Sequence, residues 1–242
     1  MDIGSKPKTN PEKMDFKTAW EAMKRLIEDP EDTVEVFTII RAMSGPSLRN
    51  GFRKFRVTET GKHILNQEQD LLDVLKDREH LRAMPPDSLG RAYLQFVENE
   101  EISAEGLVEA SENNVEIFAD ENITKYGKRL RDQHDLWHVL TGYGRDELGE
   151  LCLLGFTYAQ TKNRGIGLIL LVGFYQFLRT VGTFSLRPIR RGWEDGRKAA
   201  WLPEMHWETI LSQPLDELRE RLKIKEPIAY KSALKRLATN QA

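Results

Sequence analysis

Apolar residues recur three and four positions apart along most of this chain, which is the spacing of residues that share one face of an α-helix. The pattern starts within residues 16–27 and comprises Phe16, Trp20, Met23, Leu26 and Ile27. Asp29-Pro30 then supplies an N-cap residue followed by proline at a first helical position, so it predicts the start of a second helix. We expect that helix to end at Ser44-Gly45-Pro46.

The same periodicity continues in separate segments towards the C-terminus. Helices are expected over residues 67–76, after Pro85-Pro86-Asp87, over 123–140, from Asp146 to Lys162-Asn163, over 208–211, after Pro214 and around 231–236, with a short one at best in 103–112. Residues 47–62 are basic and are interpreted as an irregular surface link in preference to an anion-binding segment. No strand pattern of any length is present. The expected fold class is therefore all-α, with residues 1–13 as a disordered tail and residues 14–242 as a single multi-helix domain.

Residues 165–178 form the most apolar stretch and contain no charged side chain over fourteen positions. That length is short of the roughly 20 residues that a membrane-spanning helix needs. A buried core helix is the preferred interpretation. The alternative is an apolar wall facing a hydrophobic ligand or a membrane surface, with Gly165, Gly167 and Gly173 leaving room for the ligand.

Composition narrows the class of protein. The 242 residues suffice for one substantial core, and the net charge of −2 gives no general basic field, so nucleic acid is not an expected partner. The single cysteine, Cys152, excludes an internal disulfide framework and lies in an apolar run, which indicates a buried thiol in a reducing compartment. Residues 1–13 resemble neither a secretory signal nor a transit peptide, and we therefore expect a cytoplasmic location.

The chain carries one constellation with the chemistry of a metal site. In His134-Asp135-x-x-His138, the two histidines are four residues apart and fall on one helix face. Glu150 follows His138 after eleven residues, and on a continuous helix it would lie too far from the histidines to share a ligand. The Thr141–Gly144 run can end the first helix, so that a second helix returns beside it and brings Glu150 back to the histidines. Imidazoles and carboxylates converging in this way suit Zn²⁺, Fe²⁺, Mn²⁺ or Co²⁺. A bare histidine pair at this spacing is as often only solvated; the added carboxylates and the glycine break favour ligands.

Arginines gather late in the chain, at Arg187, Arg190, Arg191 and Arg197, with Trp193 and Trp201 between and after them. Such a cluster suits phosphate, carboxylate or anionic headgroups, although solvation is the default role of each member.

These residues resemble the ubiquinone (coenzyme Q) biosynthesis protein family, specifically the fourth protein of that pathway, from about Asp15 to Ile224. Its signature is the His-Asp-x-x-His motif followed after eleven residues by Glu, and it is matched without departure. Further matching stretches are 88–93, 129–133, 135–142, 207–208 and 214–219. Because the mitochondrial leader of eukaryotic members is absent, the chain is expected to be a bacterial-type member, peripheral to the inner membrane.

The resemblance implies a helical fold, a metal held by the motif and an apolar cavity for an isoprenoid chain. It also implies action on a polyprenylated benzoate-derived ring, with removal of the C1 carboxyl and hydroxylation at that carbon. A polyprenylated quinone precursor or isoprenoid lipid, other ubiquinone biosynthesis proteins and a second copy in a homodimer are the expected partners.

The resulting hypothesis is a metal-dependent decarboxylase. His134, His138 and Glu150 are its expected ligands, Asp135 is a fourth ligand or orients a histidine, and zinc is the preferred metal over iron, manganese or cobalt. Arg131 or Arg145 could bind the substrate carboxylate. For each arginine, however, an ion pair with the neighbouring Asp132 or Asp146 is the preferred role. Leu168, Leu171 and Phe174 contact the tail. The rival from another class is a non-catalytic scaffold that binds isoprenoid lipid around a structural metal. A His-Asp phosphohydrolase is disfavoured because His63 and His80 lie in polar surroundings.

Overall fold

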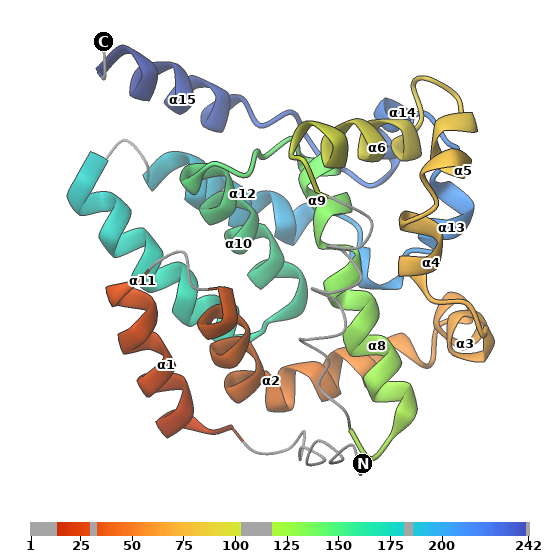
Figure 1. Cartoon of the computed structure of the whole chain (residues 1–242), viewed down its shortest axis with the longest axis horizontal. Coiled ribbons are helices and arrows are strands. Elements are labelled where there is room, and N and C mark those ends of the chain that lie inside the picture. The colour runs from red at the N-terminus through yellow and green to blue at the C-terminus, as the bar shows by residue number, and fades with distance from the viewer. Residues whose placement is uncertain (1–13, 30–32, 103–117, 182–185, 241–242) are drawn as a thin grey trace.

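A computed structural model describes residues 14–29, 33–102, 118–181 and 186–240, and these residues are helical with short connections (Figure 1). The elements in chain order are α1 (Phe16–Glu28), α2 (Thr33–Phe55), α3 (Glu59–Asn66), α4 (Leu71–Leu75), α5 (Arg78–Ala83), α6 (Leu89–Asn99), α8 (Glu121–Asp132), α9 (His134–Thr141), α10 (Glu147–Thr161), α11 (Arg164–Val181), α12 (Leu186–Lys198), a 3₁₀ turn η2 (Leu202–Glu204), α13 (Trp207–Ile210), α14 (Leu215–Arg221) and α15 (Ile228–Asn240). Within those ranges no β-strand occurs, and an isolated bridge joins Ser88 to Pro214. The all-α, single-domain prediction is confirmed.

Helix α10 occupies the centre of the molecule, with α11 on one side and α12 on the other (Figure 1). It approaches α12 closely because Gly192 and Gly196 face the main-chain carbonyls of Cys152 and Phe156, where a Cβ atom on either glycine would collide. The largest apolar cluster surrounds this pair and extends to α6, α9, α14 and α15. Its bulkiest buried members are Trp137, Trp207, Tyr93, Phe156, Leu71, Leu75, Leu81, Leu89 and Leu136.

A second packing unit consists of α1, α2 and the first half of α11 (Figure 1). Its small core contains Ala22, Met23, Leu26, Ile39 and Ile169. Cys152 is buried in the main core as expected, and burial raises the pKa of its thiol, which keeps it protonated. The expected disordered tail, residues 1–13, and the expected short helix at 103–112 lie outside the described residues.

Two local predictions are wrong. Residues 47–62 are not an irregular link, because the second half of α2 and helix α3 cover most of them. The expected helix end at Ser44-Gly45-Pro46 is confirmed as a break, since the Gly45 backbone is not helical and a second helical half follows it to Phe55. The helix expected over 123–140 is divided at Gln133, whose buried side chain accepts a hydrogen bond from Trp207 Nε1 at 2.6 Å. The arginines from Arg187 to Arg197, for which no secondary structure was predicted, belong to helix α12.

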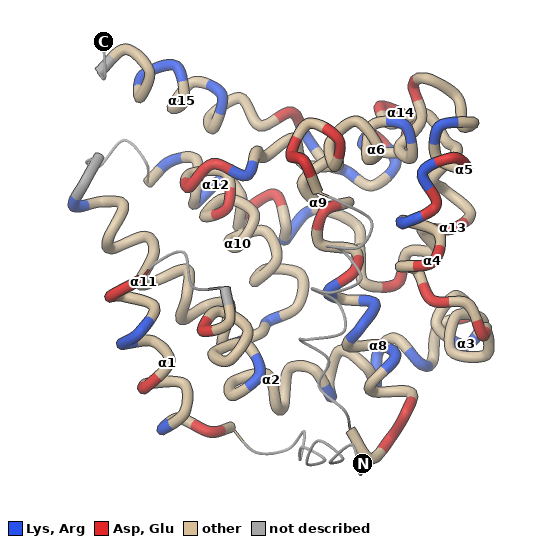
Figure 2. The backbone as a smooth tube through the Cα atoms, in the orientation of Figure 1, with Lys and Arg blue, Asp and Glu red and all other residues tan. Residues whose placement is uncertain are grey.

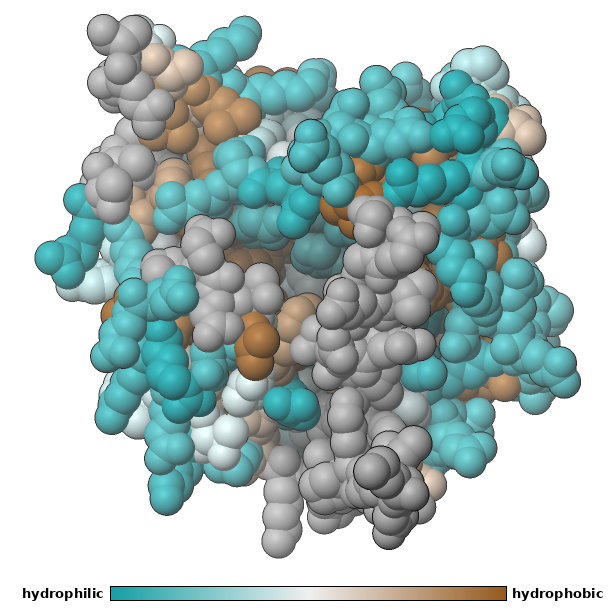
Figure 3. Space-filling model, in the orientation of Figure 1, coloured by the Kyte–Doolittle hydropathy of each residue, from teal (hydrophilic) through white to brown (hydrophobic). Residues whose placement is uncertain are grey.

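The charged side chains of both signs are interspersed over most helices, whereas α11 carries none between its terminal arginines (Figure 2). In the view of Figure 3, hydrophilic side chains cover much of the described surface, with hydrophobic atoms exposed in patches between them. Among the described helices, none combines the length and the hydropathy that crossing a bilayer requires.

Candidate metal centre

The candidate site is built on the hairpin formed by α9 and α10. His134 is the first residue of α9 and His138 follows one turn later; the helix then ends at Gly142, whose φ of 71° is left-handed and favours glycine. Asp146 starts α10 by accepting a hydrogen bond from the Gly149 amide at 3.1 Å, which places Glu150 in the first turn. The predicted hairpin geometry is confirmed.

The hairpin brings three potential ligands together. His138 Nε2 lies 3.4 Å from Glu150 Oε1, and His134 Nε2 lies 4.0 Å from Glu150 Oε2. One ligand atom from each of the three residues lies within 4.8 Å of the others, and no other such group occurs among the described residues. Two ligands that each lie about 2.1 Å from a tetrahedral zinc ion are about 3.4 Å apart, so only a small closure would complete coordination.

The orientation of His138 supports its use as a ligand. Its Nδ1 lies 3.0 Å from the carbonyl oxygen of Tyr143, and Phe96 of α6 stacks on its ring with centroids 5.5 Å apart. When Nδ1 donates to that carbonyl, Nε2 is the unprotonated nitrogen that a metal requires. This Nε2 is buried and faces the Glu150 carboxylate, 3.4 Å away, so both groups can bind one cation placed between them. The residues present therefore fit a bound divalent metal.

The pKa values of His134, His138 and Glu150 depend on one another. Partial burial, followed by the charge of His138, lowers the pKa of His134. Burial also lowers the pKa of His138, but the Glu150 carboxylate and the Tyr143 carbonyl outweigh it, so the net change is a raised pKa. Burial raises the pKa of Glu150, and the adjacent His138 more than reverses this effect. A carboxylate beside two imidazoles is thus ionised and available to a cation.

Asp135 is not a member of the three-residue group, although its charge raises the pKa of both histidines. Of the two roles predicted for Asp135, the structure does not place it with the three potential ligands, and its effect on the histidines is electrostatic.

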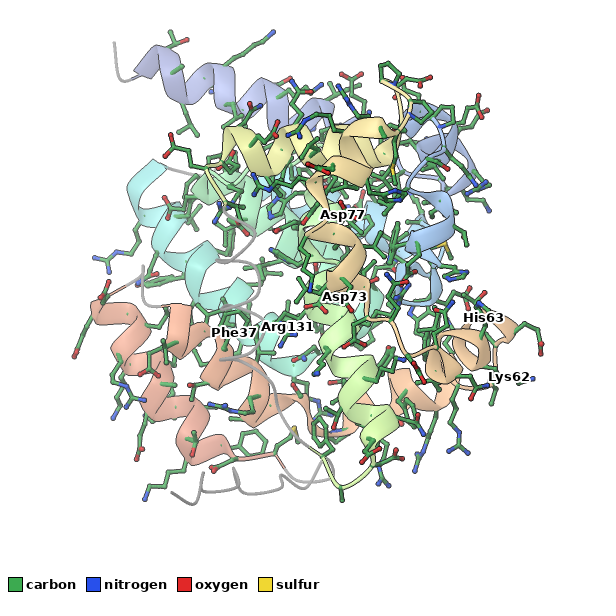
Figure 4. All side chains as sticks on the ribbon, turned by 45° about the vertical axis from the view of Figure 1, so that its right-hand side comes forward. Phe37, Lys62, His63, Asp73, Asp77 and Arg131 are labelled. Carbon is green, nitrogen blue, oxygen red and sulfur yellow. The ribbon has the colours of Figure 1, made fainter. Side chains whose placement is uncertain are left out.

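The two predicted anion-binding arginines lie in different surroundings. Arg131, near the end of α8, forms an ion pair with Asp132 at 3.0 Å, which was its preferred role (Figure 4). Arg145 forms an ion pair at 3.7 Å with Glu100, at the end of α6. The expected partner was Asp146. Its charge lowers the pKa of both His134 and Glu150, so Arg145 is electrostatically coupled to the cluster.

An apolar cavity of about 680 Å³ lies between α1, α2, α10, α11 and α12. Leu168 and Leu171 line it as predicted, whereas Phe174 packs against the main core instead. Of the three glycines expected to leave room for a ligand, Gly167 lines the cavity. Gly165 and Gly173 instead permit close contact with α2 and with Leu151, respectively.

The cavity and the ligand cluster share one face of α10. Glu150, Leu154 and Tyr158 follow one another at four-residue intervals, and Tyr158 lines the cavity. Eight residues of helix span about 12 Å, which is the distance along α10 from the cluster to the cavity wall.

Three residues that contribute to the surroundings of the ligand cluster were not predicted from the sequence. Phe96 and Glu100 come from α6, and Tyr230 of α15 bonds the loop between α9 and α10. All three lie far from the His-Asp-x-x-His motif in the sequence, so no local pattern indicates that they contact it. His63, in contrast, is on the outlying helix α3 and faces His206, with ring centroids 5.0 Å apart, so it contributes nothing to this centre (Figure 4).

Fold and site together define an all-helical protein with a candidate two-histidine, one-carboxylate metal centre near an apolar cavity. The family model described as Coenzyme Q (ubiquinone) biosynthesis protein Coq4 matches residues 7–228. This chain belongs to that family.

Individual relatives agree with the family assignment. The mitochondrial ubiquinone biosynthesis protein coq4 of Botryotinia fuckeliana is 28% identical over 179 residues, which cover 70% of this chain and 59% of the relative. The corresponding Podospora anserina protein is 26% identical over 175 residues, covering 69% of this chain and 54% of the relative. This chain therefore matches less than two thirds of either relative's length.

A solved structure supports the fold. A crystal structure of a protein assigned to ubiquinone biosynthesis in Nostoc punctiforme superposes with a TM-score of 0.64 and covers 88% of this chain and 100% of its own. At 18% identity, this similarity concerns the fold alone.

Proposed function

We propose that this chain is a metal-dependent enzyme of ubiquinone biosynthesis that replaces the C1 carboxyl of a polyprenylated benzoate-derived ring by a hydroxyl. The observation that carries the proposal is the convergence of three potential ligands: the buried Nε2 of His138 faces Glu150 Oε1 at 3.4 Å, and His134 Nε2 lies 4.0 Å from the other carboxylate oxygen.

Three protein ligands are the number that catalytic centres use, because a fourth position then stays open for substrate. His134, His138 and Glu150 would hold the ion, with zinc preferred and iron, manganese or cobalt as alternatives. When bound, the metal supplies Lewis acidity that draws electron density from the ring as carbon dioxide departs.

The protein's own residues position the substrate. Arg145 can offer its guanidinium to the ring carboxylate if Glu100 yields its place, because the pair is partly exposed and 3.7 Å long. Leu154 leads along α10 towards Tyr158 and the apolar cavity, where Leu168 and Leu171 can receive the prenyl tail. Phe96 shields the His138 face from water.

Replacement of a carboxyl by a hydroxyl is a two-electron oxidation of the ring. The C1–carboxyl bond breaks, carbon dioxide leaves and a C1–oxygen bond forms. The proposal therefore requires an external two-electron oxidant, for which we name dioxygen. The balanced reaction takes the ring acid, water and dioxygen to the hydroxylated ring, carbon dioxide and hydrogen peroxide, with water as the source of the hydroxyl oxygen.

The alternative function is a non-catalytic scaffold that binds isoprenoid lipid and presents intermediates to other biosynthetic enzymes. The cavity suits this role equally well. A structural zinc site would normally be closed by four protein ligands, and the cluster of three favours the enzyme.

The test is turnover by purified, metal-loaded protein in air with a short-tailed prenylated hydroxybenzoate, followed by mass spectrometry of the ring product. The enzyme proposal predicts a product that has lost the carboxyl and gained one hydroxyl. Activity should disappear in Glu150→Gln and persist in Glu147→Gln, an exposed glutamate of the same helical turn. Saturable substrate binding with no product would instead establish the scaffold.

A further inference from the structure

A second pair of histidines lies outside the candidate metal centre. His63 belongs to α3 and His206 directly precedes α13, so only tertiary packing brings them together. Their rings meet edge to face, with centroids 5.0 Å apart and planes at 71°. Helix α3 lies at one edge of the molecule, away from the hairpin of α9 and α10 (Figures 1 and 4). We call these two residues the α3–α13 histidine pair.

The separation of the two rings is that of imidazoles which share a metal ion. Two rings bound through nitrogen to one tetrahedral ion, about 2.1 Å from each nitrogen, have centroids about 5 Å apart. The candidate ligands of the hairpin, His134 and His138, have nearly the same geometry, with centroids 4.9 Å apart and planes at 88°. The spacing of the α3–α13 histidine pair therefore suits one shared ion.

One ring nitrogen of this pair is buried without a hydrogen bond. His206 Nε2 has no hydrogen-bond partner, and the Glu208 carboxylate, at 3.8 Å, is too far away to accept one from it. Both oxygens of that carboxylate accept hydrogen bonds from Arg129 instead. Burial of an unsatisfied polar nitrogen is costly, and a bound ion would satisfy it. The opposite charges of Glu208 and Arg129 offset each other, so they do not repel a cation.

Both rings can offer a lone pair. Burial, assisted by the charges of Arg129 and His63, lowers the pKa of His206 although the charge of Glu208 raises it, so the ring is neutral at neutral pH. The amide nitrogen of Gln67 lies 2.9 Å from His63 Nε2 and donates to it when that nitrogen is unprotonated. A metal ion that binds there would displace only this exposed amide.

The remaining coordination positions would be filled by water. Among the described residues, no third histidine or carboxylate joins the α3–α13 histidine pair in a compact group like that of the hairpin. Imidazole is a preferred ligand of zinc and copper, and open positions occupied by water are common for both ions.

We propose that the α3–α13 histidine pair binds Zn²⁺ or Cu²⁺ and thereby ties α3 to the start of α13. The residues that follow His206 hold the approach to α9. Trp207 donates a hydrogen bond to Gln133 at 2.6 Å, and Glu208 pairs with Arg129 of α8 at 2.6 Å. An ion at the pair therefore stabilises the side of the molecule on which α8 joins α9. This site does not depend on the enzyme function proposed above.

The experiment is a Zn²⁺ titration of the double variant His134→Ala, His138→Ala, in which the candidate centre has lost both imidazoles. The chain contains five histidines, so His63, His80 and His206 remain. Calorimetry should detect one Zn²⁺ per chain, and the ion should raise the midpoint of thermal unfolding. Adding His63→Gln should weaken binding at least about tenfold and abolish that rise, because one of two protein ligands is lost.

A titration is required because a site with two protein ligands should bind more weakly than the hairpin and lose its ion during purification. The matched control adds His80→Gln to the double variant instead of His63→Gln. His80 is an exposed histidine of α5, and its removal should leave both binding and stabilisation unchanged.

A second measurement uses the wild-type chain and so does not require the double variant to fold. Substoichiometric Cu²⁺ should broaden the ring-proton NMR signals of the α3–α13 histidine pair, beside those of the hairpin, and leave the signals of His80 sharp. Sharp signals from the pair would overturn the proposal. So would a folded double variant that binds no Zn²⁺, or one that loses binding equally with His63→Gln and His80→Gln. None of these results changes the dependence of the hairpin's metal on His138, so the two metal sites are tested separately.

Discussion

The hydroxyl of Tyr230 donates a hydrogen bond to the carboxylate of Asp146, which links α15 to the residue that starts α10. The same hydroxyl accepts a hydrogen bond from the Gly144 amide at 3.0 Å, and the Tyr230 ring packs edge-on against Tyr143. Since the Tyr143 carbonyl orients His138, the C-terminal helix helps to fix both sides of the hairpin that holds the ligands.

Removing this hydroxyl should loosen the candidate centre while preserving the fold. Tyr230→Phe keeps the buried ring but loses both hydrogen bonds, and groups that orient metal ligands typically affect metal affinity by about 10- to 100-fold. We expect metal affinity, measured by competition with a chelating dye, to fall at least about tenfold. Binding that remains at wild-type strength would remove Tyr230 from this role.

The control for this variant is Tyr126→Phe. Tyr126 is equally buried but packs against Phe52 and Phe55 in a separate apolar cluster. Its metal affinity should match that of wild type, and the thermal unfolding of both metal-free variants reports any loss of stability unrelated to the metal.

The candidate ligand cluster could be predicted because its determinants are local. The four-residue histidine spacing, the left-handed Gly142 and the Asp146 cap all lie within one short segment, and each acts through backbone geometry. Tyr230 and Phe96 could not be predicted, because only tertiary packing brings α15 and α6 to the hairpin. The division of the long helix at Gln133 has the same origin, since its side chain is bound by the distant Trp207.

The helix break near residue 45 could be predicted because its cause is local. Gly45-Pro46 ends a helix because proline lacks an amide donor and clashes with the preceding turn, and the Gly45 backbone is indeed not helical. The second helical half, which runs to Phe55, could not be predicted. It is held by tertiary packing, since Phe52 and Phe55 lie in a different core from Ile39 of the first half.

The buried ion pair between Arg129 and Glu208 should make stability depend on pH. Arg129 donates to both carboxylate oxygens, at 2.6 and 2.9 Å. Burial raises the pKa of Glu208, but Arg129 outweighs it and holds the pKa below the usual 4.5. The pair therefore contributes stability above that pH and loses it as pH falls through the lowered pKa.

Glu208→Gln should lower the free energy of unfolding by roughly 3 kcal/mol at neutral pH, because one partner of a buried pair is lost. Urea unfolding at neutral pH and below pH 4.5 should show this difference shrinking in acid. Glu226→Gln, which removes an exposed partner of Lys231, should have little effect at either pH. A pH-independent deficit in Glu208→Gln would contradict the account.

Substitutions of two helical glycines should have opposite effects on the stability of the protein, because Gly192 lies at the close crossing of α10 and α12 and Gly127 does not. A Cβ atom at Gly192 would lie 2.3 Å from the Cys152 carbonyl oxygen, so Gly192→Ala should destabilise the protein by about 1–3 kcal/mol. Gly127 in α8 has open space at that position, and Gly127→Ala should stabilise by about 0.5–1 kcal/mol. Thermal unfolding of both variants checks the prediction, and a neutral Gly192→Ala would mean that the two helices are not in such close contact.

The most direct test of the central claim is the metal content of tag-free protein, measured by mass spectrometry on wild type beside His138→Ala. We predict about one divalent metal per wild-type chain and its loss in the variant, with both proteins folded by circular dichroism. Iron, manganese or cobalt would favour redox-linked decarboxylation, whereas zinc would be compatible with either the enzyme or the scaffold. Wild-type protein that binds no metal after incubation with each of these ions would contradict the metal centre.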